Sequence, residues 1–186
     1  MKKLTRWVIA LACGAAVIPA FSAQEGQYKV IHNFGGTGDG ELPTGPVAVG
    51  NGGVLYGTTQ YGGSGPSCVY GYQGCGTVYS LTPPESPGEA WTETVLYNFT
   101  GGADGGVVGA GLTAGDNGVL YGATSLGGDA ACTNQGTAGC GVVFSLTPPA
   151  SPGGAWTETV LYTFTGGSDG AFPNSLVAAT ERFQTP

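Results

Sequence analysis

Short stretches of alternating apolar and polar residues, separated by clusters of Gly, Pro and Asp, make up most of this chain. Over residues 77–81 the alternation places Thr77, Tyr79 and Leu81 on one face, and residues 91–99 alternate in the same way. A period of two predicts β-strands. Asp-Gly and Gly-Gly pairs predict tight turns between them, and the Pro-rich stretches predict connectors that lie outside central strands. We therefore expect an all-β protein.

The pattern repeats at a constant offset, which carries Val54 onto Val119. This internal repeat is the strongest signal in the sequence. One unit of about four strands per repeat is the layout of a propeller blade, and such a blade must stack on its neighbours to bury its apolar faces. We expect tandem four-stranded antiparallel repeats, arranged as an incomplete propeller of about two and a half blades. The matching segments are 54–59 with 119–124, 76–84 with 141–149, and 91–102 with 156–167, and a weaker copy of the last block lies at 28–36.

These repeats give a domain organisation for the whole chain. After residue 23 we expect a partial copy over 24–53, a unit over 54–118, a unit over 119–183 whose last part is degenerate, and a tail over 184–186. Two full copies are fewer than the four to eight blades of closed propellers. We therefore expect the chain to be an incomplete form of a longer repeat protein. As an isolated chain it should be marginally stable, associate through its open repeat ends, or derive from a reading frame interrupted after about residue 180.

Residues 1–23 have the three parts of a secretory signal peptide: basic residues, an apolar run and an exit of small residues. The apolar run of about twelve residues is shorter than the roughly 20 that a membrane span needs. Cleavage after Ala23 is expected, with Ala20 and Ser22 as alternative sites, and Cys13 leaves a lipoprotein as a further alternative. We expect a secreted or cell-surface protein, with the periplasm as the other compartment.

Four cysteines follow the signal: Cys68, Cys75, Cys132 and Cys140. Export favours disulfides, and we expect Cys68 to pair with Cys75 and Cys132 with Cys140, because each pair brackets one Gly-rich loop at an equivalent place in the two repeats. A zinc site is the alternative. The spacings of seven and eight differ from those of zinc ribbons, and no His accompanies the cysteines.

Composition and charge exclude several classes of partner. The chain has 37 Gly and 12 Pro among 186 residues, with 41% hydrophobic and 9% charged residues, which is typical of a turn-rich folded protein and not of a disordered one. Removal of residues 1–23 leaves two basic and twelve acidic residues, a net charge of −10. Such a chain repels nucleic acids and anionic membranes, so we expect no nucleic-acid partner and no membrane insertion of the mature chain.

The motifs L-Y-G-T-T, G-G, G-T-V-Y/F-S-L-T-P, L-Y-x-F and G-G-x-D-G resemble those of the GloVer tandem-repeat family of exported bacterial proteins. They are found in 55–59, 62–63, 76–83, 96–99 and 101–105, with a second copy at the repeat offset. The resemblance covers nearly all of the mature chain. It implies a β-propeller-like repeat domain, and it carries over no catalytic residue.

Candidate chemistry is sparse. The single His, His32, stands where the other copies have Tyr, which indicates a packed side chain. Glu93 with Asp104, and Glu158 with Asp169, are candidate carboxylate pairs for glycoside hydrolysis, but their duplication favours a structural role. Calcium at the turn residues is not favoured, because each turn offers one carboxylate and Asp before Gly forms turns without an ion. The three turn residues are Asp39, Asp104 and Asp169.

The repeats differ most in the two cysteine-bracketed loops. Residues 64–74 carry Tyr70 and Tyr72, and residues 129–139 carry Asn134 and Gln135. Variation on rigid loops is how binding modules diversify contacts, so we take these four residues as candidate ligand contacts. We expect a non-enzymatic binding or structural module whose partner is a glycan or a surface protein, with no catalytic residue and no cofactor. A carbohydrate-active hydrolase or lyase is the alternative. It requires non-repeated acids that meet in an aromatic cleft, with Glu25, Glu41, Asp116 and Asp129 as the candidates.

Overall fold

The computed structural model describes residues 29–35, 38–66, 68–69, 72–134 and 137–176. The signal peptide predicted at 1–23, Glu25 and the predicted tail at 184–186 lie outside these residues. Within them the protein is all-β, with two four-stranded antiparallel sheets, one small hairpin and two three-residue 3-10 turns. The all-β, four-stranded antiparallel prediction is confirmed. The two sheets do not close a ring, so a propeller arrangement is not established.

The first sheet has the order β1-β2-β3-β4 and contains β1 (Gly40–Val49), β2 (Leu55–Gly62), β3 (Thr77–Thr82) and β4 (Thr92–Asn98). The second sheet has the order β10-β9-β6-β5 and contains β5 (Thr113–Ala114), β6 (Leu120–Thr124), β9 (Val142–Thr147) and β10 (Thr157–Thr163). The 3-10 turns η1 (Asn51–Gly53) and η2 (Asp116–Gly118) precede β2 and β6, and β7 (Thr133–Asn134) pairs with β8 (Thr137–Ala138). Each sheet therefore begins one strand before the L-Y-G motif and ends with the W-T-E-T-V-L-Y strand.

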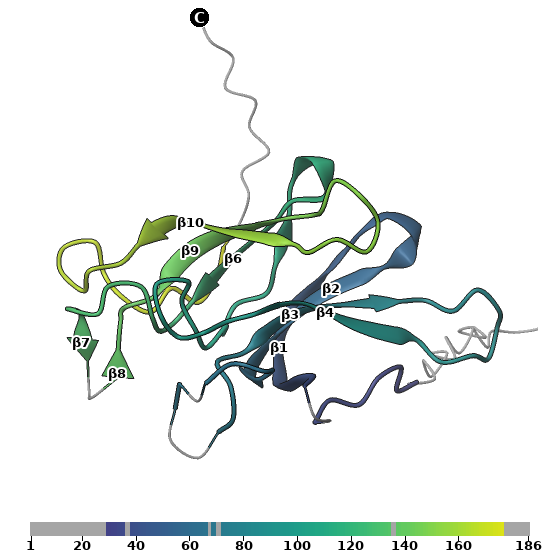
Figure 1. Ribbon diagram of the computed structural model, residues 1–186, viewed down its shortest axis with the longest axis horizontal. Coiled ribbons are helices and arrows are strands. Elements are labelled where there is room, and N and C mark those ends of the chain that lie inside the picture. The colour runs from purple at the N-terminus through teal and green to yellow at the C-terminus, as the bar shows by residue number, and fades with distance from the viewer. Residues whose placement is uncertain (1–28, 36–37, 67, 70–71, 135–136, 177–186) are drawn as a thin grey trace, which may run out of the picture.

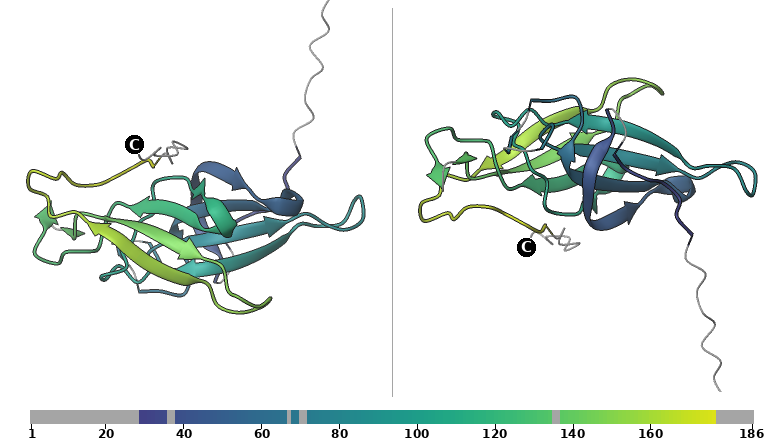
Figure 2. Two further views of the ribbon diagram at one scale, coloured as in Figure 1. Left: turned by 90° about the horizontal axis from the view of Figure 1, so that it is seen from above. Right: turned by 90° about the horizontal axis from the view of Figure 1, so that it is seen from below.

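The two sheets pack face to face and share one core (Figure 1). Phe99, which follows β4, meets Phe144 of β9 with ring centroids 5.1 Å apart, and Tyr56 of β2 meets Trp156 at 6.0 Å. Figure 2 shows the sheets stacked in two views, with the Pro-rich connector between β3 and β4 extending beyond them. The buried members of the core come from both repeats: Cys75, Val78, Phe99, Val108, Leu112, Leu120, Phe144 and Leu146.

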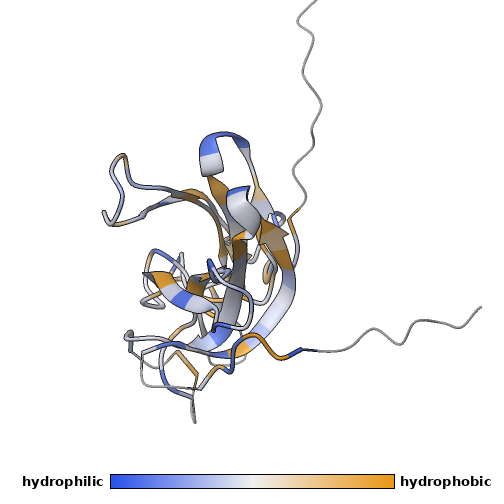
Figure 3. Ribbon diagram, turned by 90° about the vertical axis from the view of Figure 1, so that its right-hand side faces the viewer, coloured by the Kyte–Doolittle hydropathy of each residue, from blue (hydrophilic) through white to orange (hydrophobic). Residues whose placement is uncertain are grey.

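Hydropathy follows this packing: apolar residues lie along the strands that cross the middle of the molecule, whereas several turns at its ends are hydrophilic (Figure 3). The glycine of the L-Y-G motif explains how large rings fit. A Cβ on Gly122 would lie 2.5 Å from the Phe144 ring, so the ring can lie flat across β6 only because this residue has no side chain. Gly57 has the same relation to the Tyr79 ring.

Candidate functional site

The two cysteine loops are closed by disulfides between Cys68 and Cys75 and between Cys132 and Cys140, the pairs expected from the sequence. Their Cα atoms are 5.0 and 5.7 Å apart. Two disulfides indicate an oxidising environment outside the cytoplasm. Among the described residues, no helix is long and apolar enough to cross a membrane.

The first disulfide loop lies beside a pocket of about 340 Å³. Three segments converge there: the turn before β1, the end of β2 and the disulfide loop. The backbone ties them together, because Gly63 donates to the carbonyl of Asp39 at 2.7 Å and Gly62 donates to the carbonyl of Gln73 at 2.7 Å. The residues that line the pocket are Gly35, Gly38, Asp39, Glu41, Gly62, Gly63 and Gln73.

Two tyrosines that do not line this pocket themselves are neighbours of residues that do. Tyr61 is paired with Glu41 across β1 and β2, and Tyr72 directly precedes Gln73. Their rings stack with centroids 4.0 Å apart and an interplanar angle of 14°. Tyr72 remains exposed, and burial together with the neighbouring Tyr72 raises the pKa of Tyr61 above its ordinary value. The pocket therefore has an aromatic pair beside two carboxylates and one amide.

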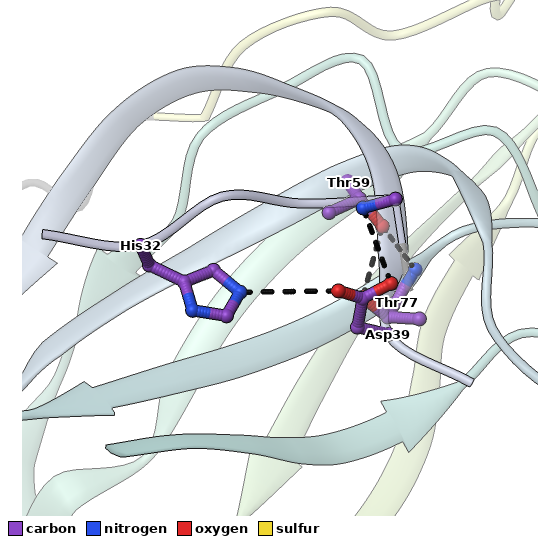
Figure 4. Close-up of polar contacts among 5 residues, drawn as sticks. His32, Asp39, Thr59 and Thr77 are labelled. Carbon is purple, nitrogen blue, oxygen red and sulfur yellow. Dashed lines mark hydrogen bonds and ion pairs between the residues drawn. The ribbon is translucent and has the colours of Figure 1, made fainter. Parts of the chain in front are cut away.

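Behind the pocket, polar contacts fix the turn that carries Asp39 (Figure 4). The amide of Gly35 donates to Asp39 at 3.3 Å, and His32 Nε2 lies 3.9 Å from the Asp39 carboxylate. The His32 ring also packs edge-on against the Phe34 ring, which agrees with the packed side chain that the sequence indicates for His32. Beneath them the buried Thr59 and Thr77 hydroxyls are hydrogen-bonded at 2.9 Å.

The equivalent place in the second unit has a pocket of about 260 Å³ of different character. Its lining contains only Gly and Ala. The repeat offset explains the difference, because the second unit has Gly106, Leu126, Thr137 and Ala138 in place of Glu41, Tyr61, Tyr72 and Gln73. Glu41, Tyr61, Tyr72 and Gln73 are therefore specific to the first unit, whereas the scaffold and the turn Asp, which is Asp39 in the first unit and Asp104 in the second, are common to both.

The predicted ligand contacts are distributed unevenly around these features. Tyr72 belongs to the first pocket's aromatic pair. The backbone of Asn134 pairs with Thr137 in the small hairpin, and Tyr70 and Gln135 lie outside the described residues. Sequence reasoning missed Glu41, Tyr61 and Gln73 as members of one site. The signal that could have found them is the position-by-position difference between the two copies.

The repeated acids have a structural role. Asp104 accepts hydrogen bonds from the Thr100 amide, the Thr100 hydroxyl and, at 3.2 Å, from Tyr97. Asp169 makes the same three contacts at the equivalent place in the second unit. Each turn Asp thus accepts a hydrogen bond from the backbone amide of the residue four positions earlier in the chain. The described residues hold no group of three or more His, Cys, Asp or Glu side chains suited to a metal ion.

The charge that acts on each repeated glutamate comes from the turn Asp of the preceding unit. Burial, together with the Asp104 charge, raises the pKa of Glu158 to about 7. Glu93 stands in the same relation to Asp39: burial raises the pKa of Glu93, His32 opposes the shift and Asp39 adds to it. Among the described contacts, the buried Oε1 atoms of both glutamates have no hydrogen-bond partner.

The three non-repeated acids among the described residues lie in different places. Glu41 lines the first pocket, and Asp116 lines a separate cavity near the two 3-10 turns. Asp129 accepts from the Ala131 amide within the second disulfide loop, and Glu25 lies outside the described residues. No protein family, curated protein or solved structure matches this chain.

Proposed function

We propose that this protein is an exported, non-enzymatic binding module whose ligand is a neutral glycan. The observation that carries the proposal is the contrast between two equivalent pockets, of which only the first has a stacked tyrosine pair, a non-repeated carboxylate, Glu41, and an amide, Gln73, around it. Residues that serve the fold recur in both copies of the repeat. Polar and aromatic side chains that occur in only one copy are therefore candidates for a dedicated binding site.

The chemistry of the first pocket favours a sugar. The face of a tyrosine ring accepts the C–H groups of a pyranose, while carboxylate and amide groups form hydrogen bonds with its hydroxyls. A volume of about 340 Å³ lies at the lower end of ligand pockets and suits one or two sugar rings. The net charge of −10 of the mature chain opposes acidic polysaccharides. A protein partner on the exposed loops is the competing occupant.

The secretory signal predicted at residues 1–23, the two disulfides and the resemblance to GloVer repeats support a location outside the cytoplasm, secreted or at the cell surface, or in the periplasm. The face-to-face stacking of two four-stranded sheets supports a propeller-type arrangement of the repeats. We further propose that no resident cofactor takes part, because the turn carboxylates already accept hydrogen bonds: Asp39 from a backbone amide, and Asp104 and Asp169 each from an amide and a Thr hydroxyl.

A carbohydrate-active hydrolase or lyase is the second candidate, and one observation favours it. Asp39 and Glu41 line the same pocket, and two carboxylates flanking a bound sugar are the groups that glycoside hydrolysis uses. Asp39, however, belongs to the repeated turn, which supports the binding role over the enzymatic one.

A glycan array probed with the purified protein tests the proposal. We expect binding to neutral oligosaccharides, loss of binding for Tyr72→Ala, and retention for Gln60→Ala, because Gln60 directly precedes Tyr61 on β2 and points to the opposite face of the sheet. Because Tyr72 is exposed, its replacement should leave the fold intact, which circular dichroism checks. No binding to any glycan would refute the proposal. Release of reducing sugar from a bound glycan, abolished by Glu41→Gln, would establish the enzyme instead.

A further inference from the structure

The face of the second sheet that points away from the first sheet carries a set of exposed apolar side chains. We call this set the open face. Leu161 and Tyr162 are 52% and 48% exposed, and Phe172, in the segment after β10, is 36% exposed. Contiguous exposed apolar residues of this kind mark interaction surfaces in soluble proteins. The open face consists of the exposed Leu161, Tyr162 and Phe172 and the half-buried Val143 and Phe164.

Each member of the open face has a counterpart in the first unit, at the repeat offset, that the second sheet covers. Phe99 and Val78 are fully buried, and Val107 is 5% exposed. Leu96 and Tyr97 pack against the shared core. The same sequence pattern thus forms an interface in the first unit, and in the second unit a surface that none of the described residues covers in the same way. The open face therefore has the composition of a buried interface.

The polar rim of the open face is already arranged as it is in that interface. Tyr162 donates to Asp169 at 3.1 Å, as Tyr97 donates to Asp104 at 3.2 Å. In the first unit this pair borders Phe99 and the second sheet packs over it, whereas in the second unit no described segment covers it. The open face needs no rearrangement before it can dock.

The complementary surface within the molecule is occupied. On the outer face of the first sheet, Phe34 packs against Tyr79 with centroids 4.7 Å apart, in the way that Phe99 packs against Phe144. Tyr79 and Leu81 are each only 4% exposed as a result. A second copy therefore cannot dock head to tail without displacing residues 29–35. The apolar surface that a second copy offers for contact is its own open face.

We propose that the open face is the interface of a symmetric dimer, in which β10 and Phe172 of one copy pack against the same elements of a second copy. A two-fold interface buries both open faces at once and closes the assembly. The strands that carry the open face, β9 and β10, have six and seven residues and are therefore about 20 to 23 Å long. Two neighbouring strands of this length present less than the roughly 800 Å² per partner of standard interfaces, so we expect a weak dimer that forms only at high protein concentration.

Sedimentation of the purified protein at 1 to 500 μM tests the proposal. We expect a monomer–dimer equilibrium for the native chain, and monomers throughout for Leu161→Asp. Phe172→Asp should also give monomers. Because Phe172 lies in the segment after β10, outside the sheet, this variant tests the interface even if Leu161→Asp folds poorly. Val30→Asp, an exposed apolar residue beside the outer face of the first sheet, serves as the matched control and should dimerise normally.

Three results would overturn the dimer: a native chain that stays monomeric to 500 μM, assemblies that keep growing with concentration, or equal weakening by Val30→Asp and Leu161→Asp. Continued growth would show head-to-tail stacking instead. The glycan array is independent of this experiment, since none of the open-face residues lines the first pocket.

Discussion

Replacement of Glu158 by Gln should stabilise the protein at high pH and leave it unchanged at low pH. Glu158 lies between the two sheets beside Asp104, and burial and that neighbouring charge raise its pKa from the ordinary 4.5 to about 7. A folded-state pKa above the unfolded value means that the charged form destabilises the fold. The full penalty is present above about pH 7 and disappears as the pH falls toward 4.5.

The size of the effect follows from the pKa. A change from 4.5 to about 7 corresponds to about 3.4 kcal/mol between the charged and neutral forms. Because the Glu158 side chain is only partly buried, solvent screens the charge, and we expect about 1 kcal/mol of this to remain. Gln has the shape of the protonated carboxyl and no charge. The Glu158→Gln chain should therefore be about 1 kcal/mol more stable than the native chain at pH 8 and equal to it at pH 4.5.

Urea unfolding followed by tryptophan fluorescence measures the difference, because Trp156 lies between the sheets beside Tyr56. Glu85→Gln is the control: it removes the same charge from the exposed connector between β3 and β4 and should have little effect at either pH. A Glu158→Gln effect that is the same at pH 8 and pH 4.5, or a loss of stability at pH 8, would refute the placement of Glu158 against Asp104.

Three further perturbations have defined outcomes. Phe99→Ala should lower the free energy of unfolding by about 3 to 5 kcal/mol in urea titrations, because it empties the contact with Phe144, whereas the exposed Phe172→Ala should cost less than about 1 kcal/mol; similar losses would contradict the shared core. Replacing Cys68 and Cys75 by Ser should cost about 2.5 kcal/mol in the same titrations, the chain-entropy value for a loop of this length, and an unchanged midpoint would show that the bond does not constrain the chain. Gly122→Ala should lower the melting temperature through overpacking against the Phe144 ring, and a calorimetric scan that matches the native one would contradict this geometry.

The all-β class, the strands, the unit length and the disulfide pairs could be predicted from the sequence because each depends on local pattern. Alternation at Thr77–Thr82 gives β3, and the spacing of Cys68 and Cys75 around a Gly-rich loop gives a bond. The boundary of a unit could not be predicted, since a tandem repeat has no intrinsic starting point. The hydrogen bonds of β1 with β2 place that boundary near Gly40.

The candidate site was only partly visible in the sequence. Tyr72 could be selected because it lies in a variable loop, but Glu41 and Tyr61 are far apart along the chain and become neighbours only through the register of β1 and β2. The sequence suggests Glu93 with Asp104 as a pair within one unit, because these two acids are close to each other along the chain. Stacking of the sheets brings Glu158 to Asp104 of the preceding unit, and a repeat read as a single unit does not show such contacts.

Isothermal titration of the native, Tyr72→Ala and Gln60→Ala proteins with the neutral oligosaccharide that binds most strongly on the array tests the central claim most directly. If the tyrosine pair and its pocket form the glycan site, Tyr72→Ala should weaken binding at least about tenfold, the equivalent of roughly 1.4 kcal/mol, and Gln60→Ala should bind like the native protein. Equal affinity of the native and Tyr72→Ala proteins would contradict the account, because the ligand would then bind elsewhere on the molecule.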